Sequence, residues 1–182
     1  MKRSLSGARR RRLSAVAGAA VFLVALSACT GDQTEAEKEY VVPQSACGAP
    51  INAKALSGFL PSGKKVTVEA TSQSGAASKC AISVDGKLVV QTSREWWNDM
   101  TTFEFARGMT LDDPDKRTDD GRYLYSGYQA FGKATECEGG QRKDQVLFTA
   151  IQAVGTRHRD DTAMKQLIID YTQAVEKSPM CR

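Results

Sequence analysis

The chain has little histidine, no long apolar run and none of the short motifs that assemble common catalytic centres. His158 is the single histidine, and it stands between Arg157 and Arg159 in a polar segment. Neither a Gly-x-Ser-x-Gly element nor a Cys-x-x-Cys pair occurs. A catalytic base needs an orienting partner and a nearby nucleophile, and structural zinc sites need closely spaced ligands. These absences argue against a serine hydrolase and against a metal site.

The longest apolar run covers about residues 13–26. It is shorter than the ~20 residues that a transmembrane helix needs. Six basic residues precede the run, and small residues follow it. The basic residues are Lys2, Arg3, Arg9, Arg10, Arg11 and Arg12. This layout is typical of a secretory signal peptide. Because Arg10-Arg11-Arg12-Leu13 also fits a twin-arginine signal, the export route stays open.

The signal ends in Leu26-Ser27-Ala28-Cys29, which resembles the lipobox of bacterial lipoproteins. The resemblance implies that residues 1–28 are removed and that Cys29 carries a thioether-linked diacylglycerol. Two acyl chains anchor a protein stably, whereas one binds only marginally. We therefore expect a lipid-anchored protein on the extracytoplasmic face of the cell membrane, with no other cofactor.

Removal of the signal changes the charge of the chain. The precursor has 25 basic and 21 acidic residues. Without the six basic residues of the signal, 19 basic residues remain against 21 acidic ones, a net charge near −2. The basic character of the precursor therefore does not indicate nucleic-acid binding.

Four cysteines remain after Cys29, which favours two disulfides in an oxidising compartment. They are Cys47, Cys80, Cys137 and Cys181. Four cysteines allow three connectivities. We favour the sequential pairs Cys47–Cys80 and Cys137–Cys181, because each would join a segment flanking a predicted helix to a predicted strand.

The mature chain divides into a tether and one domain. Residues 29–46 comprise the lipidated cysteine and a polar, acidic stretch that cannot bury enough apolar surface to order itself. Residues 47–182 are long enough for one hydrophobic core. We expect a flexible acidic tether followed by a single domain.

Periodicity predicts the elements of this domain. Asn52 precedes a short helical pattern that Pro61-Ser62-Gly63 ends, and Asp85-Gly86 joins two alternating runs, as in a type I′ hairpin. Residues 122–131 alternate as one strand, and residues 146–154 are apolar on both faces, as in a central strand. Residues 94–105 fit either a helix or a strand, and residues 111–121 read as a loop.

The final pattern is the clearest helix, with Asp160 or Asp161 as its cap and Ser178-Pro179 at its end. The sequence therefore predicts an α+β fold, with an antiparallel sheet and a short N-terminal and a longer C-terminal helix packed mainly on one face. Leu60-Pro61-Ser62-Gly63 and the segment from Cys80 to Gly86, together with the lipobox, resemble small actinobacterial lipoproteins of uncharacterised function. The resemblance implies a location at the cell membrane and a fold of this kind.

Clustered aromatics are the main candidates for a binding surface. Trp96 and Trp97 cannot both face the core of a strand, and exposed aromatics stack on sugars or anchor peptides. The other candidates are Tyr123, Tyr125, Tyr128 and Phe131. The alternative is that these side chains build the core, since aromatics at alternating spacing are more often core than binding platform.

Two acidic groups offer weaker alternatives. Asp112, Asp113, Asp115, Asp119 and Asp120 could supply oxygen ligands to calcium, but Lys116 and Arg117 neutralise the centre. Glu136 and Glu138 flank Cys137 and could do acid–base work on a glycan. In each case the simpler interpretation is a solvated surface segment.

These observations favour a binding or interaction module of the cell envelope. The partners we consider are an envelope protein, a cell-wall polymer and a small extracellular ligand. The alternative is an enzyme that processes cell-wall glycan or peptide with Asp or Glu side chains. A structural envelope component is the third possibility. Carboxylates that converge in a cleft would favour the enzyme, and an open aromatic face or sheet edge would favour the binder.

Overall fold

The computed structural model describes residues 37–110, 112, 114–137, 142 and 144–181. The signal segment and Cys29 lie outside them. The elements are β1 (Ser45–Ala46), β2 (Ala49–Pro50), α1 (Ala53–Ser57), β3 (Val66–Gln73), β4 (Ala77–Val84), β5 (Lys87–Asn98), α2 (Thr102–Met109), β6 (Lys116–Arg117), β7 (Tyr123–Tyr125), β8 (Gln129–Lys133), β9 (Gln145–Gln152), α3 (Asp161–Glu176) and the 3₁₀ turn Pro179–Cys181. No helix among the described residues is long and apolar enough to span a bilayer.

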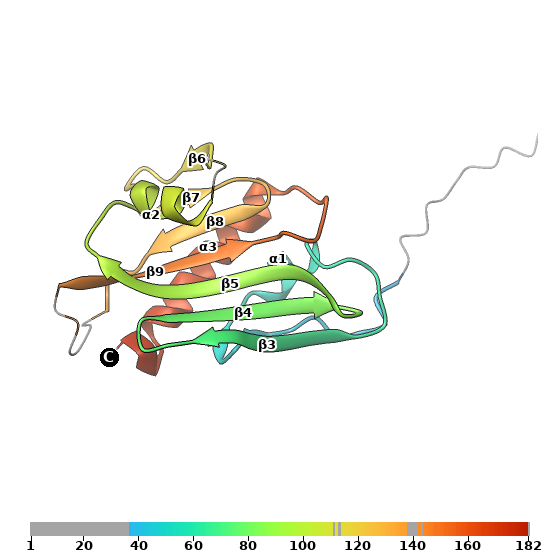
Figure 1. The fold of residues 1–182 in the computed structure, drawn as a ribbon. Coiled ribbons are helices and arrows are strands. Elements are labelled where there is room, and N and C mark those ends of the chain that lie inside the picture. The colour runs from blue at the N-terminus through green and yellow to red at the C-terminus, as the bar shows by residue number, and fades with distance from the viewer. Residues whose placement is uncertain (1–36, 111, 113, 138–141, 143, 182) are drawn as a thin grey trace, which may run out of the picture. The chain divides into compact units, whose positions relative to one another are not determined.

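Seven strands form one antiparallel sheet in the order β3-β4-β5-β9-β8-β7-β6. Helix α3 runs across one face, which we call the back face, and α2 lies on the other, the front face (Figure 1). Gly132 of β8 approaches α3 so closely that an added Cβ would lie 2.4 Å from the hydroxyl of Thr172. The α+β class and the antiparallel sheet are therefore confirmed. The front helix α2 is an addition to the two helices that the sequence predicted.

The core lies mainly on the back face. There α1 and α3 pack on the sheet through large, fully buried side chains. These include Leu56, Phe59, Leu147, Ile151, Met164, Leu167, Ile168 and Tyr171. A smaller cluster under α2 holds Phe105, Ala106, Leu124, Phe131, Phe148 and Ala150. Strand β9 is central and contributes to both clusters, which confirms the predicted doubly covered strand.

The predicted helix starts and the hairpin are confirmed. The side chain of Asn52 accepts a hydrogen bond from the N–H of Ala55 and caps α1, and Asp160 caps α3 through the N–H of Ala163. Asp85 and Gly86 have φ values of 48° and 78° between β4 and β5. Both are left-handed, as a type I′ turn requires. Strands β1 and β2 form a small second sheet outside the main one.

Two strand predictions need correction. Residues 122–131 are not one strand but the hairpin β7–β8, because the chain turns between Ser126 and Gln129, where the N–H of Ser126 donates to the carbonyl of Gln129. Residues 94–105 contain a strand followed by a helix, where the sequence had left the two as alternatives. Strand β5 continues to Asn98, and α2 starts after Thr101. The predicted loop over residues 111–121 contains the two-residue strand β6, and positions 111 and 113 lie outside the described residues.

Contacts with the domain begin before the expected boundary at Cys47. The N–H of Glu39 donates to the carbonyl of Gly63 over 2.9 Å, and the ammonium of Lys38 donates to the carbonyl of Ser57 over 2.6 Å. The hydroxyl of Tyr40 donates to the carbonyl of Pro61. Tyr40 and Val42 also pack against the core, and Ala46 is fully buried in it. Residues 37–46 therefore belong to the domain and not to the expected tether. Residues 30–36 of the expected tether lie outside the described part of the chain.

Candidate functional site

The four cysteines form the favoured pairs. Cys47 bonds to Cys80 and joins the β1–β2 turn to β4. Cys137 bonds to Cys181 and joins the segment after β8 to the turn that follows α3. Each bridge ties a segment beside the sheet to the domain. The cysteines therefore stabilise the fold and leave the front face without a described thiol.

The structure does not bring the candidate aromatics together in one surface. Trp96 is 8% exposed and packs in the back core, whereas Trp97 is 40% exposed on the front face, where its ring meets Phe105 edge to face. Tyr123 is buried with the back core, and Tyr125 is half-buried there. Trp97 is the one exposed side chain of these four, because successive residues of a strand point to opposite sides and Trp96 faces the core.

Tyr128 lies apart from these rings, at the β7–β8 turn. Its hydroxyl donates to the carboxylate of Asp112 over 2.7 Å, and the guanidinium of Arg159 lies 4.4 Å from its ring centre. Burial and the Asp112 carboxylate raise the pKa of this phenol. Tyr128 therefore holds the loop after α2 against the sheet and is not a free binding platform.

The remaining candidates are not assembled into a centre. The ring of His158 is exposed and lies edge to face with Phe59. Among the described residues, no group of three or more His, Cys, Asp and Glu side chains is placed to hold a metal ion. Glu136 is exposed beside Cys137, and Glu138 lies outside the described residues.

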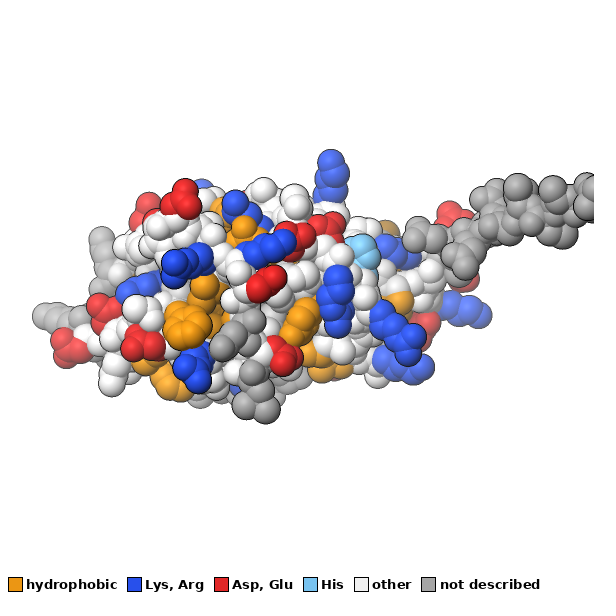
Figure 2. All heavy atoms as spheres, turned by 90° about the horizontal axis from the view of Figure 1, so that it is seen from above, with side chains coloured by type: hydrophobic (Ala, Val, Ile, Leu, Met, Phe, Trp, Pro, Cys, Tyr) orange, Lys and Arg blue, Asp and Glu red, His pale blue; other side chains and the backbone are white. Residues whose placement is uncertain are grey.

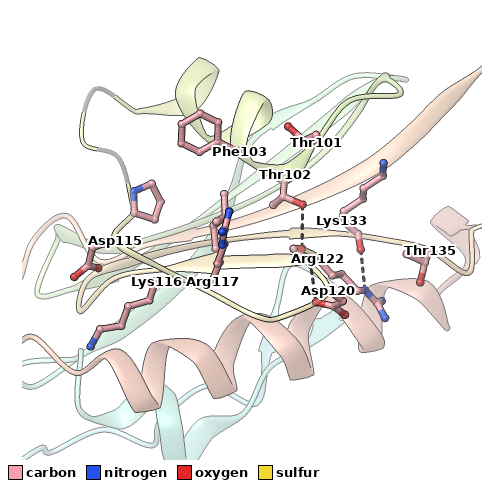
Figure 3. A pocket seen from close by; sticks show the side chains of 13 residues that line it. Thr101, Thr102, Phe103, Asp115, Lys116, Arg117, Asp120, Arg122, Lys133 and Thr135 are labelled. Atoms are coloured by element: carbon pink, nitrogen blue, oxygen red, sulfur yellow. Dashed lines mark hydrogen bonds between the residues drawn. The ribbon is translucent and has the colours of Figure 1, made fainter.

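A pocket of about 920 Å³ lies at the start of α2, and it includes Asp115 and Asp120 from the acidic run that the sequence offered as calcium ligands. Residues 101–103 of the α2 start form one side, and residues 114–117 and 120–122, around β6, form the other. Leu124, Lys133 and Thr135 complete it. Phe103 and Arg117 face each other across this space (Figure 3). We call it the front pocket.

The charges of the front pocket are mostly neutralised. Of its four cations, Lys116 pairs with Asp161, Arg122 with Glu176 over 2.6 Å and Lys133 with Asp99 over 2.6 Å. Arg117 is exposed, and its side chain has no ion-pair or hydrogen-bond partner within the described part of the chain. Acidic and basic side chains are interspersed on this side of the molecule, with a small apolar patch between them (Figure 2). The pocket therefore lacks the single-sign field of a polyanion site.

The start of α2 is already satisfied. The hydroxyl of Thr101 accepts the N–H of Glu104, and the carboxylate of Glu104 accepts the N–H of Thr101 over 2.8 Å, so a capping box closes the first turn. These hydrogen bonds lower the pKa of Glu104 below its usual value. A ligand in the pocket would meet the ring of Phe103 rather than open helix N–H groups.

The carboxylates of the pocket lack the features of an acid–base pair. The hydroxyl of Thr118 and the N–H of Arg122 donate to Asp120 and lower the pKa of its carboxyl. A glycosidase needs one carboxyl that stays protonated near neutral pH. Asp120 is held ionised instead, which suits hydrogen-bond acceptance.

A row of buried polar groups lies on the front face of β5. Ser93 and Glu95 are 2% and 7% exposed, and Ser93 Oγ and Glu95 Oε1 have no hydrogen-bond partner among the described residues. The ammonium of Lys79 lies 3.7 Å from Glu95 Oε1, and Trp97 Nε1 donates to Glu95 Oε2 over 3.2 Å. Because these groups are closed from solvent, they have no access to a substrate.

Comparisons with protein-family models, with curated protein sequences and with solved structures find no match to this chain. The interpretation of the front pocket therefore rests on its own chemistry.

Proposed function

We propose that this chain is a lipid-anchored, extracytoplasmic binding module of the cell envelope, and that its front pocket holds a polar, sugar-containing segment of a cell-wall polymer. The observation that carries the proposal is the lining of the pocket. It combines an exposed aromatic ring, a guanidinium without a partner among the described residues, and the carboxyl groups of Asp115 and Asp120 around one hollow.

Each group suits one part of a sugar. The ring of Phe103 is 45% exposed and offers a flat apolar surface on which the C–H face of a pyranose can stack. The guanidinium of Arg117 donates in a planar fork to hydroxyl or carboxylate oxygens. Asp115 and Asp120 accept hydrogen bonds from ligand hydroxyls. The neutralised charge balance favours such a ligand over a polyphosphate.

The same groups favour binding over hydrolysis. The hydrogen bonds from Thr118 and Arg122 lower the pKa of the Asp120 carboxyl in the front pocket. The buried carboxylate of Glu95 does not line this pocket. A lowered pKa does not suit a general acid, so Asp120 favours binding over the glycan-processing enzyme.

The experiment is a titration of the protein with soluble peptidoglycan fragments, followed by calorimetry. We expect Phe103→Ala and Arg117→Gln each to weaken binding about tenfold, the loss of one good contact. Trp97→Ala is the matched control, because Trp97 is an exposed front-face aromatic outside the pocket. Loss of binding in Trp97→Ala alone would place the site elsewhere. Release of shorter saccharides during the titration would favour the enzyme.

The anchor is tested separately, since Cys29 lies outside the described residues. Cys29→Ala should prevent labelling by radioactive palmitate and leave the chain unprocessed or released from membranes. A Cys29→Ala protein that still runs as a mature, membrane-bound species would contradict the lipobox interpretation.

A further inference from the structure

The two edge strands of the seven-stranded sheet differ in length. Strand β6 ends the sheet with two residues, Lys116–Arg117, whereas β3 ends it with eight, Val66–Gln73. β4 is the only described strand that pairs with β3, and β3 forms the lower margin of the sheet in Figure 1. A long unpaired edge is a template for another strand.

The hydrogen bonds of β3 show which of its backbone groups face outward. The N–H of Asp85 donates to the carbonyl of Lys65 over 2.9 Å, so Lys65 points its backbone groups toward β4. In an antiparallel ladder this orientation alternates from one residue to the next. Thr67 and Glu69 therefore also bond toward β4, whereas Val66, Val68 and Ala70 direct their N–H and C=O groups to the open edge.

The side chains along this edge are complementary to themselves. If a second copy of β3 lies antiparallel with Thr67 opposite Thr67, then Lys65 lies opposite Glu69 on both sides of the two-fold axis. Val66 then lies opposite Val68, and both present outward backbone groups. Opposite charges and Thr–Thr pairs stabilise cross-strand neighbours, and like charges destabilise them.

Other registers lose this match. A shift that places Glu69 opposite Glu69, or Lys65 opposite Lys65, brings like charges together. The intermediate registers leave Lys65 opposite an uncharged residue. The register irregularity between Ala70 and Ser72 also limits regular pairing to the first part of the strand.

We propose that β3 pairs with β3 of a second copy of this chain, antiparallel and centred on Thr67, so that two sheets join into one across a two-fold axis. Such an interface is isologous, because the same edge serves both copies. Residues 65–70 supply it, and the front pocket does not contribute to it. The inference is therefore independent of the proposed ligand.

Cysteine cross-linking tests the register in cells that express the full chain. Thr67 lies in a non-hydrogen-bonded pair, whose Cα atoms are about 4.5 Å apart, within the range of a disulfide. Thr67→Cys should therefore form a cross-linked dimer on mild oxidation. Glu69→Cys and Lys65→Cys alone should not, whereas the double variant carrying both should. Equal cross-linking of Glu69→Cys and Thr67→Cys, or none in Thr67→Cys, would overturn the proposal.

A charge exchange provides the second measurement, by sedimentation of the detergent-extracted full chain. Lys65→Glu and Glu69→Lys should each weaken the dimer about tenfold, because each variant creates like-charge pairs on both sides of the axis. The combined variant restores opposite charges and should restore the dimer. Failure of the combined variant to recover, while it remains folded by circular dichroism, would contradict this pairing.

Discussion

The two faces of the sheet are built differently. On the back face, α1 and α3 bury a continuous set of large side chains, with Leu167, Ile168 and Tyr171 fully inaccessible. On the front face, α2 covers only a small cluster around Phe105, and buried polar groups of β5 lie on the same face. Buried apolar area is the main source of folding free energy. The back face therefore contributes most of the apolar burial that stabilises the domain.

The largest expected effect separates two aromatic side chains, one on each face. Tyr171→Ala should lower the free energy of unfolding by about 3–5 kcal/mol, because it leaves a cavity in the back core. It also removes the hydrogen bond to the hydroxyl of Thr92. Phe103→Ala on the front face should change it by less than about 0.5 kcal/mol. Urea unfolding followed by circular dichroism measures both, and equal losses would mean that the front face contributes as much as the back.

The next effect concerns a link between the faces. Glu176 of α3 accepts hydrogen bonds from Arg122, Thr135 and Glu136 with the single oxygen Oε1, over 2.6, 2.7 and 3.2 Å. Its side chain is 3% exposed and that of Arg122 is 19% exposed. Glu176→Ala should lower the free energy of unfolding by about 2–3 kcal/mol, since it leaves the partly buried guanidinium of Arg122 and two backbone N–H groups without their acceptor.

The same substitution should weaken ligand binding, although Glu176 does not line the front pocket, because Arg122 and Thr135 do. A double-mutant cycle with Arg122→Met measures the coupling between the two side chains. Additive losses of stability would show that the ion pair is not the connection between the back helix and the pocket.

The elements of the back face were predictable from the sequence because local signals set them. The Asn52 and Asp160 caps, the Asp85-Gly86 turn and the apolar stripe of α3 each lie within a short segment. The disulfide pairing followed from those elements. The back core could therefore be inferred from patterns of periodicity and capping.

The front face was not predicted, for two physical reasons. The Thr101-x-x-Glu104 capping box was present as a helix-start signal, but the strand propensity of the preceding tryptophans obscured it. The front pocket itself joins the α2 start, the segment around β6 and the end of β8, which are distant in the chain. A site of this kind has no local pattern, because tertiary packing creates it.

A smaller effect compares the helix caps of the two faces. Thr101→Ala and Asp160→Ala should each lower stability by about 1 kcal/mol at most, the usual loss on removing a cap. The two substitutions should differ in how much of the domain shows raised hydrogen exchange. Loss of the Thr101 cap should raise hydrogen exchange in α2 alone, since few buried contacts hold this helix. Loss of the Asp160 cap should raise exchange throughout the back core, and a local effect there would contradict the assigned difference between the faces.

The smallest effect comes from the exposed pair between Lys116 of β6 and Asp161 of α3. The hydrogen bond from Lys116 lowers the pKa of Asp161, and the carboxylate of Asp161 raises the pKa of Lys116. The lowered pKa of Asp161 stabilises the fold at pH values above the pKa of the unfolded carboxyl, which is about 4. This stabilisation is lost as the pH falls through the folded value. Stability from the raised ammonium pKa is present below about pH 10.4 and is lost as the pH rises through the folded value.

Asp161→Asn should therefore lower the melting temperature slightly across the neutral range, and the difference from the unmodified chain should vanish in acid. Added salt should reduce the difference as well, because both side chains are exposed. Asp119→Asn is the matched control, as Asp119 is an exposed acid near the same strand without a described ion pair. If the difference in melting temperature between Asp161→Asn and the unmodified chain persisted in acid, its cause would be a change in the first turn of α3 rather than loss of the ion pair. Strand β6 would then depend on its backbone pairing with β7 and on packing for its place beside the pocket.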